Sequence, residues 1–120
     1  MYTLDTNILI YHAASEPFAT SFFEERHGDV FYVPSIAIAE FLSYPLINEI
    51  AVSAFRSFIS QTIIVNLDVR VAELAAEVRK KYHVKLLDAV VAATAFSTNS
   101  VLVTKDAHFK KIKGLPLFEF

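Results

Sequence analysis

Four short apolar segments of strand length are separated along this chain by segments with helical spacing. They are residues 2–4 (YTL), 30–33 (VFYV), 63–65 (IIV) and 101–103 (VLV). Each is a continuous apolar run without polar alternation, which indicates a strand buried on both faces. Such strands alternating with helices favour an α/β fold. We therefore expect a three-layer α/β/α sandwich whose mainly parallel sheet has about five strands, with an edge strand at residues 117–118.

Between these runs, apolar residues recur with the spacing of helices that pack one face against a core. Ser35 and Asp68 are residue types that commonly cap helix N-termini. Pro45 is expected to end the helix that precedes it. We expect helices over residues 6–12, 19–26, 36–44, 47–61, 69–78, 86–96 and 106–112.

The composition of the chain indicates one apolar domain without cysteine. Hydrophobic residues make up 54% of the 120 residues, and the mean hydropathy is +0.42. This suffices for a single domain over residues 1–120, and it indicates that part of the apolar surface is buried against a partner. No run approaches the roughly 18 apolar residues of a membrane span. The lack of cysteine excludes disulfides and thiolate metal sites and fits a cytoplasmic protein.

The charges are distributed unevenly along the chain. Residues 1–78 carry three basic and ten acidic side chains, a net charge of −7. Residues 79–120 carry eight basic and three acidic side chains, a net charge of +5. A basic end of this kind can bind a phosphate backbone, although basic residues at helix ends also occur simply as solvated charges.

Four isolated acids lie in or directly beside the most apolar segments. Asp5 follows the first strand, and Asp106 follows the strand of residues 101–103 after a short turn. In an open parallel sheet, the carboxyl ends of neighbouring strands form one edge, where ligands bind. Glu40 and Asp88 lie in helices that are otherwise apolar, where a charge is costly unless it is paired or binds a metal.

Each acid also has a structural explanation of its own. Asp5 and Asp106 are suited to cap the helices that follow them. Asp88 can stabilise the first turn of its helix through the helix dipole, and Glu40 can point into solvent. These explanations do not account for the four acids together. Converging carboxylates are the ligands that Mg²⁺ and Mn²⁺ prefer, and one or two such ions would support phosphodiester cleavage.

Four segments of the chain resemble the acidic motifs of PIN-domain ribonucleases, whose small bacterial and archaeal members are VapC-type toxins. The segments are LDTNILI, AEFLSYP, LLDAVVAATA and LVTKDAHF; they occur in the family's order, and their acids span residues 5 to 106. The resemblance implies a PIN-like fold with a five-stranded sheet. It also implies cleavage of RNA by metal-activated water with Mg²⁺ or Mn²⁺, a homodimer, and a small antitoxin protein as partner.

The resemblance assigns roles to individual residues. Thr6 and Thr104 match hydroxyl positions that orient carboxylates, and Asn7 matches a polar position beside the site. His108 stands where many relatives have a further acid, which lowers the negative charge available to a second ion. The catalytic metal ligands would be Asp5, Glu40, Asp88 and Asp106, with Asp5 at the centre. The lysines expected to bind RNA are Lys85, Lys105, Lys110 and Lys111.

Two other classes of protein share parts of this pattern. A phosphoacceptor receiver domain has a similar length, α/β alternation and an acid after its first strand. It would require paired acids there, whereas Asp5 has no acidic neighbour; its acceptor would be Asp68, and Glu40 and Asp88 would have no role. A PIN fold that binds RNA or protein with little catalysis is the other alternative, which metal dependence would distinguish from a nuclease.

Overall fold

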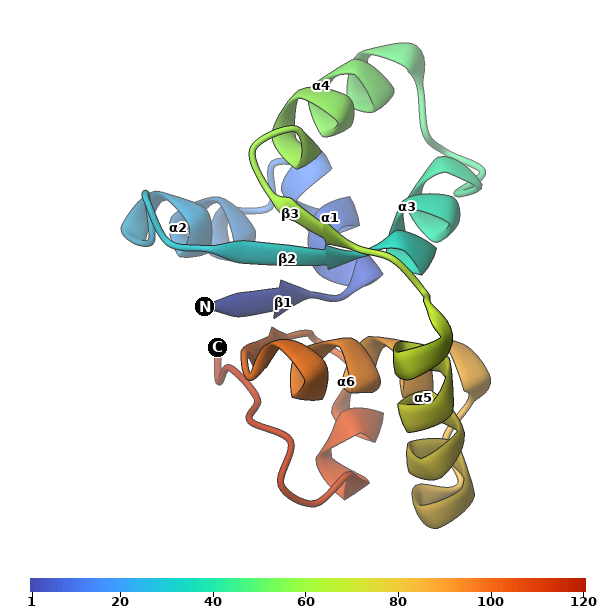
Figure 1. Cartoon of the computed structure of the whole chain (residues 1–120). Helices are drawn as coiled ribbons and strands as arrows, with labels where there is room; N and C mark the ends of the chain where they lie inside the picture. The colour runs from blue at the N-terminus through green and yellow to red at the C-terminus, as the bar shows by residue number, and fades with distance from the viewer.

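The computed structural model describes residues 1–120 and contains a four-stranded sheet in which every pairing is parallel (Figure 1). The order of the strands in the sheet is β3-β2-β1-β4. β1 is therefore a central strand, flanked by β2 and β4, and the expected parallel sheet is confirmed. The strands are β1 (Tyr2–Leu4), β2 (Phe31–Pro34), β3 (Ile63–Val65) and β4 (Val101–Val103). The expected burial of residues 63–65 on both faces is wrong, because β3 is an edge strand in which Ile63 is 50% exposed and Ile64 is 43% exposed.

Six α-helices and one 3₁₀ helix cover the sheet. They are α1 (Thr6–Ala13), α2 (Pro17–Glu25), α3 (Ser35–Leu42), α4 (Glu49–Ile59), α5 (Val69–Tyr82), α6 (Leu86–Thr98) and the 3₁₀ helix η1 (Ala107–Lys111). α1 to α4 lie on one side of the sheet, and α5, α6 and η1 lie on the other (Figure 1). This arrangement confirms the three-layer architecture. None of the helices is long and apolar enough to cross a membrane.

The edge strand expected at residues 117–118 is reduced to one isolated bridge. Leu117 pairs in parallel with Leu102 of β4. The Leu102 N–H donates to the Pro116 carbonyl at 2.8 Å, and the Phe118 N–H donates to the Leu102 carbonyl at 2.9 Å. The carboxyl-terminal segment therefore runs beside β4 at the edge of the sheet, without a ladder long enough to form a fifth strand.

Two hydrophobic clusters, one on each face of the sheet, hold the layers together. In α6, every residue from 89 to 95 is buried, and the small side chains in this stretch let the helix lie close to its neighbours. On the other face, the rings of Phe41 in α3 and Phe55 in α4 stack with centroids 3.8 Å apart. The helices that carry Glu40 and Asp88 are thus fixed by extensive core packing.

Ser35 does not cap α3, so this expectation from the sequence is wrong. The N-cap is Pro34, whose extended backbone lets the helix begin one residue earlier. The Ser35 hydroxyl instead accepts a hydrogen bond from the N–H of Leu67, 3.2 Å away in the segment after β3. Asp68 does cap α5, where it accepts from the N–H of Val71 at 2.9 Å.

His12, in the last turn of α1, lies among aromatic rings that disfavour its charged form. Its ring centroid is 4.4 Å from that of Phe23 and 5.0 Å from that of Phe58. Its buried Nδ1 has no hydrogen-bond partner. Burial lowers the pKa of His12 below its ordinary value of 6.5, so protonation at this position opposes folding.

We expect His12→Phe to raise the melting temperature more at about pH 5 than at about pH 8. A histidine whose pKa is lowered by folding takes up a proton more readily in the unfolded chain, so stability is complete above about pH 6.5 and falls as the pH drops below it. Phenylalanine has no such proton to gain. Thermal unfolding of both proteins at the two pH values measures this difference, and an equal shift at both would contradict it.

Candidate active site

Asp5 lies at the junction of β1 and α1, with 8% of its surface exposed. It is the N-cap of α1, and its Oδ1 accepts a hydrogen bond from the N–H of Thr6 at 2.8 Å. Its Oδ2 accepts from the hydroxyl of Thr104 at 2.7 Å, across 99 positions of sequence. Asp5 therefore caps α1, which is the structural role that its sequence position suggested. Capping does not explain why its second oxygen is bonded to Thr104.

The parallel pairing of β1 with β4 brings these two segments together. The register places Leu4 beside Val103. The N–H of Asp5 continues this ladder by donating to the carbonyl of Val103 at 3.1 Å. Both chain segments therefore leave the carboxyl edge of the sheet side by side, at the position where open parallel sheets bind ligands.

Thr104 connects three parts of this edge through its hydroxyl group. The hydroxyl donates to Asp5, and it accepts from the N–H of Asp106 at 3.0 Å and from Nδ2 of Asn7 at 3.3 Å. Oδ1 of Asn7 in turn accepts from the N–H of Lys105 at 3.4 Å. The side chains of Asn7 and Thr104 thus hold the turn after β4 against the start of α1, and the family resemblance predicted both residues to lie beside the site.

Glu40 reaches the same region from α3, which packs against α1. The hydroxyl of Thr6 donates to Oε1 of Glu40 at 2.7 Å. Glu40 is half-buried, so a purely solvent-facing role does not describe it. Thr6 holds Asp5 through its backbone N–H and Glu40 through its side chain.

The environment of Asp5 is unfavourable for a negative charge. Burial raises the pKa of Asp5 from 3.8 to about 6; hydrogen bonds from Thr104 and Thr6 oppose this rise, and the charges of Asp88 and Glu40 add to it. A carboxylate in this position is stabilised by any nearby positive charge.

Asp88 lies in the first turn of α6 and is half-buried. Burial raises the pKa of Asp88, and the charges of Asp106 and Glu40 raise it further, while Lys85 and His108 oppose the rise. Asp88 therefore lies within the electrostatic field of each of the other three acids singled out in the sequence.

Asp106 is the N-cap of η1 and pairs with His108. Its Oδ1 accepts from the backbone N–H of His108 at 2.9 Å and lies 2.8 Å from the imidazole Nδ1. The His108 side chain is 76% exposed. His108 is therefore not an isolated surface residue: it pairs with Asp106, and its charge also opposes the rise in the pKa of Asp88.

The chemistry of the four acids fits a hard divalent cation, because all four offer carboxylate oxygens. As they stand, no three histidine or acidic side chains are gathered closely enough to hold an ion together. Asp106 is turned toward His108, and Glu40 is held by Thr6. Repulsion among the acids also opposes a closer approach without added positive charge. The evidence that these residues suit a divalent cation is therefore their carboxylate oxygens and the electrostatic coupling among the acids.

Two of the lysines expected to bind RNA lie on η1. Lys110 and Lys111 are both exposed, and Nζ of Lys111 lies 3.5 Å from the carbonyl of His83, just after α5. Lys85 immediately precedes α6, where its charge opposes the pKa rise of Asp88. The basic ends of α5 and η1 thus adjoin each other on the side of the sheet that carries α6.

Lys105 has an aromatic environment that no local sequence pattern revealed. Its Nζ lies 4.8 Å from the ring centroid of Phe18 and 5.4 Å from that of Phe120. These rings come from α2 and from the carboxyl-terminal segment, which meet only in the folded chain. The ammonium group is therefore held beside aromatic surface.

Asp68 does not belong to this site. It follows β3, which β2 separates from β1, and its carboxylate caps α5. A receiver domain would need this acid close to Asp5. The strand order therefore argues against the receiver alternative.

The sequence matches the PIN domain over residues 2–115. No curated protein sequence matches the chain. Among solved structures, the toxin–antitoxin complex from Klebsiella pneumoniae contains a chain that is 25% identical, with a TM-score of 0.84 and 100% of both chains covered. The structure of VapBC2 from Rickettsia felis bound to a DNA fragment of its promoter also contains a similar chain. That chain is 25% identical with a TM-score of 0.82, and the alignment covers 98% of this chain and 96% of that chain.

DNA-bound VapBC from Salmonella typhimurium contains a further similar chain. It is 23% identical, with a TM-score of 0.83, and the alignment covers 98% of this chain and 96% of that chain. This similarity supports the fold described above over nearly the whole length of the molecule.

Proposed function

Because the chain belongs to the PIN domain family, we propose that it is a Mg²⁺- or Mn²⁺-dependent endoribonuclease and the toxin of a toxin–antitoxin pair. The observation that carries the nuclease proposal is that buried Asp5 and half-buried Asp88 each have a pKa raised by burial and by the charges of neighbouring acids, Glu40 among them in both cases. Toxin–antitoxin complexes contain chains that align with nearly all of this one, which supports the toxin role. The proposed catalytic and metal-binding residues are Asp5, Glu40, Asp88 and Asp106.

The contacts around these acids suggest how the chain prepares the site. Thr104 and Thr6 each donate a hydroxyl hydrogen bond to a carboxylate, so the oxygens of Asp5 and Glu40 are held in fixed directions. Asn7 holds the turn that carries Thr104. When bound, the divalent cation would supply positive charge at the scissile phosphate and lower the pKa of the attacking water.

The surface around the start of α4 supports a protein partner. Leu46 is 80% exposed and Ile50 is 82% exposed, and Leu42 in the preceding helix is 41% exposed. Apolar side chains that are grouped and exposed in this way commonly mark interaction sites. We propose that the chain forms a homodimer and binds a small antitoxin, and that this surface takes part in one of these contacts.

The metal dependence of folding and of cleavage tests the nuclease proposal. We expect Mn²⁺ to raise the melting temperature relative to EDTA, because a ligand that binds only the folded state stabilises it. We also expect a single-stranded RNA oligonucleotide to be cut with Mn²⁺ or Mg²⁺ and to remain intact with EDTA. A melting temperature that does not respond to either cation, together with intact RNA, would contradict the proposal and favour a binding module.

Replacing Lys110 and Lys111 together by alanine is expected to weaken RNA binding and to flatten its salt dependence. Each lost phosphate contact removes roughly 0.7 from the slope of log K against log salt for a single strand, so a decrease of about 0.7 to 1.4 is expected. Fluorescence anisotropy in EDTA at several KCl concentrations measures this slope. The control is Arg56→Ala, which removes an exposed positive charge from α4 on the other side of the sheet. An unchanged slope in the Lys110 and Lys111 variant would mean that these lysines are solvated charges that do not contact RNA.

A further inference from the structure

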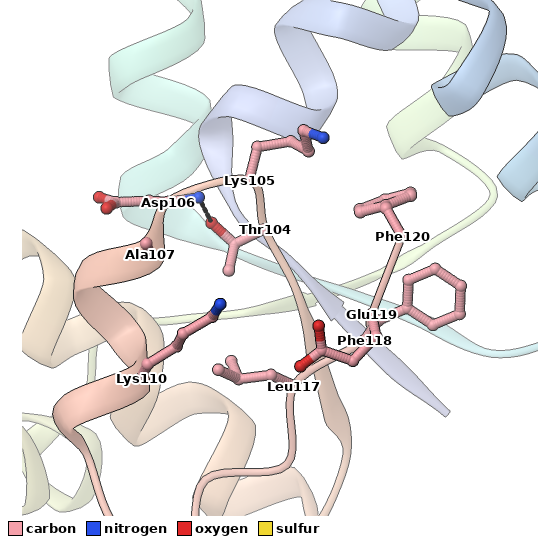
Figure 2. Close-up of a pocket in the computed structure, with 9 residues that line it drawn as sticks. All are labelled: Thr104, Lys105, Asp106, Ala107, Lys110, Leu117, Phe118, Glu119 and Phe120. Carbon is pink, nitrogen blue, oxygen red and sulfur yellow. Dashed lines mark hydrogen bonds between the residues drawn. The ribbon is translucent and has the colours of Figure 1, made fainter.

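A cavity of about 160 Å³ lies beside the proposed active site, between the turn after β4, η1 and the carboxyl-terminal segment (Figure 2). Asp106 is among the residues that line this cavity, and its carboxylate points away from the other lining side chains. It is smaller than the roughly 300–1,000 Å³ of sites that enclose a whole small molecule. Its size suits one planar ring better than a complete cofactor.

Two unpaired positive charges lie at this cavity. Lys105 and Lys110 both line it, and neither takes part in an ion pair. Figure 2 shows Lys110 reaching from η1 into the space in front of Leu117, while Lys105 extends from the turn. Lys110 supplies an ammonium group within the cavity, and Lys105 supplies a second one beside Phe120 at its border. Positive charge in these places favours an anionic group there.

The carboxyl-terminal segment adds an exposed aromatic ring in a fixed position. Phe120 is 46% exposed. Its ring packs edge to face with Phe118 at 4.9 Å and with Phe18 at 5.2 Å between centroids, and it lies 5.4 Å from Nζ of Lys105. An apolar peptide would not need the two lysines, and a free phosphate would not need the ring. Proteins that bind single-stranded RNA use the two together, with a base on the ring and its phosphate on a cation.

The same turn carries the cavity and part of the proposed active site. Thr104, whose hydroxyl donates to Asp5, also lines the cavity, and Lys105 stands between Thr104 and Asp106. A strand of RNA that lies over the acids therefore reaches the cavity after crossing this one turn.

We propose that this cavity is a subsite for the nucleotide next to the cleaved bond, with its base stacked on Phe120 and its phosphate bound by Lys105 and Lys110. This inference rests on the proposed nuclease function. Glu119, which also lines the cavity, can only accept hydrogen bonds when ionised. It therefore favours a base that presents N–H donors to the cavity.

The test measures binding of a short single-stranded RNA oligonucleotide in EDTA, so that cleavage does not interfere. Phe120→Leu keeps apolar volume but removes the aromatic face; we expect affinity to fall about fivefold or more with an unchanged salt slope. Lys110→Ala is expected to lower both the affinity and the slope, the latter by about 0.7. Tyr44→Leu, which removes another exposed aromatic ring that does not line the cavity, is the matched control and should bind as the wild type does.

Wild-type affinity in a folded Phe120→Leu protein would overturn the subsite. If that variant does not fold, Lys110→Ala decides, and wild-type affinity and slope there would overturn the subsite. These outcomes leave the nuclease proposal intact as long as the wild-type protein cleaves RNA with Mn²⁺. Absence of that cleavage would instead overturn the proposed function.

Discussion

Asp5→Asn is expected to abolish Mn²⁺-dependent RNA cleavage while making the metal-free protein more stable. Replacing residues that only support metal ligands typically lowers activity 10- to 100-fold, so loss of the central carboxylate is expected to cost more than about 100-fold. Asparagine keeps the shape and the cap at the start of α1. It removes the charge through which Asp5 would bind the cation.

The gain in stability follows from the buried charge of Asp5. Folding raises the pKa of Asp5 from 3.8 to about 6, so the folded protein holds this proton more tightly and loses stability as the pH rises from about 4 to above 6. Since one pKa unit corresponds to about 1.4 kcal/mol, asparagine should stabilise the protein by about 1–3 kcal/mol at pH 8. The benefit should vanish below about pH 4, where Asp5 is neutral in both states.

Thermal unfolding in EDTA and in Mn²⁺, beside a cleavage assay, measures both effects. Mn²⁺ should raise the melting temperature of the wild-type protein and leave that of Asp5→Asn unchanged. Asp68→Asn is the matched control, because Asp68 also caps a helix but lies away from the site. Cleavage by Asp5→Asn at the wild-type rate would contradict the catalytic role of Asp5. A variant less stable than the wild type in EDTA would contradict the proposal that the buried charge of Asp5 destabilises the fold.

Thr104→Val is expected to lower cleavage about 10- to 100-fold, as replacement of groups that orient metal ligands does. Valine has the same shape but cannot donate to Asp5 or accept from Asp106 and Asn7, which the threonine hydroxyl does at 2.7, 3.0 and 3.3 Å. Leaving buried groups without partners should also cost about 1–3 kcal/mol of unfolding free energy. Loss of the hydrogen bond to Asp5 should raise the pKa of Asp5 further, because that bond favours its charged form.

The pH profile of cleavage separates this positioning role from a general loss of stability. The acid limb of the profile should move to higher pH in Thr104→Val and return in Thr104→Ser, which restores the hydroxyl. Thr94→Val is the matched control, because Thr94 is equally a buried threonine, but its hydroxyl bonds only to the carbonyl of Val90 within α6. An unshifted profile in Thr104→Val would show that the hydroxyl does not orient Asp5.

Local patterns in the sequence sufficed to predict most of the secondary structure. The runs at residues 2–4, 63–65 and 101–103 are strands with those bounds, because β-branched and apolar residues favour strands. Burial was less predictable, since Ile63 and Ile64 lie exposed in the edge strand β3. The cap at Asp68 was predictable because a cap depends on residues three positions apart. Ser35 failed as a cap because its hydroxyl is used by Leu67, which comes near only in the folded chain.

The sequence by itself determined that four isolated acids would stand in or beside apolar segments and where three of the strands begin and end. These properties depend on residue type and on neighbours a few positions away. Only the tertiary structure decided that β1 pairs with β4, that Thr104 holds Asp5 across 99 positions, and that Thr6 holds Glu40 across 34. Such contacts depend on which strands pair and which helices pack together, and local periodicity carries no information about either.

The lysines likewise have one property that the sequence shows and one that only the fold decides. Their charge is evident in the sequence, whereas the rings of Phe18 and Phe120 beside Lys105 come from α2 and from the carboxyl-terminal segment. The fold brings these segments together because α2 packs on the sheet and the carboxyl-terminal segment follows β4 along its edge. Residue types thus set the chemistry that the chain has available, and the pairing and packing of distant segments decided where that chemistry is gathered.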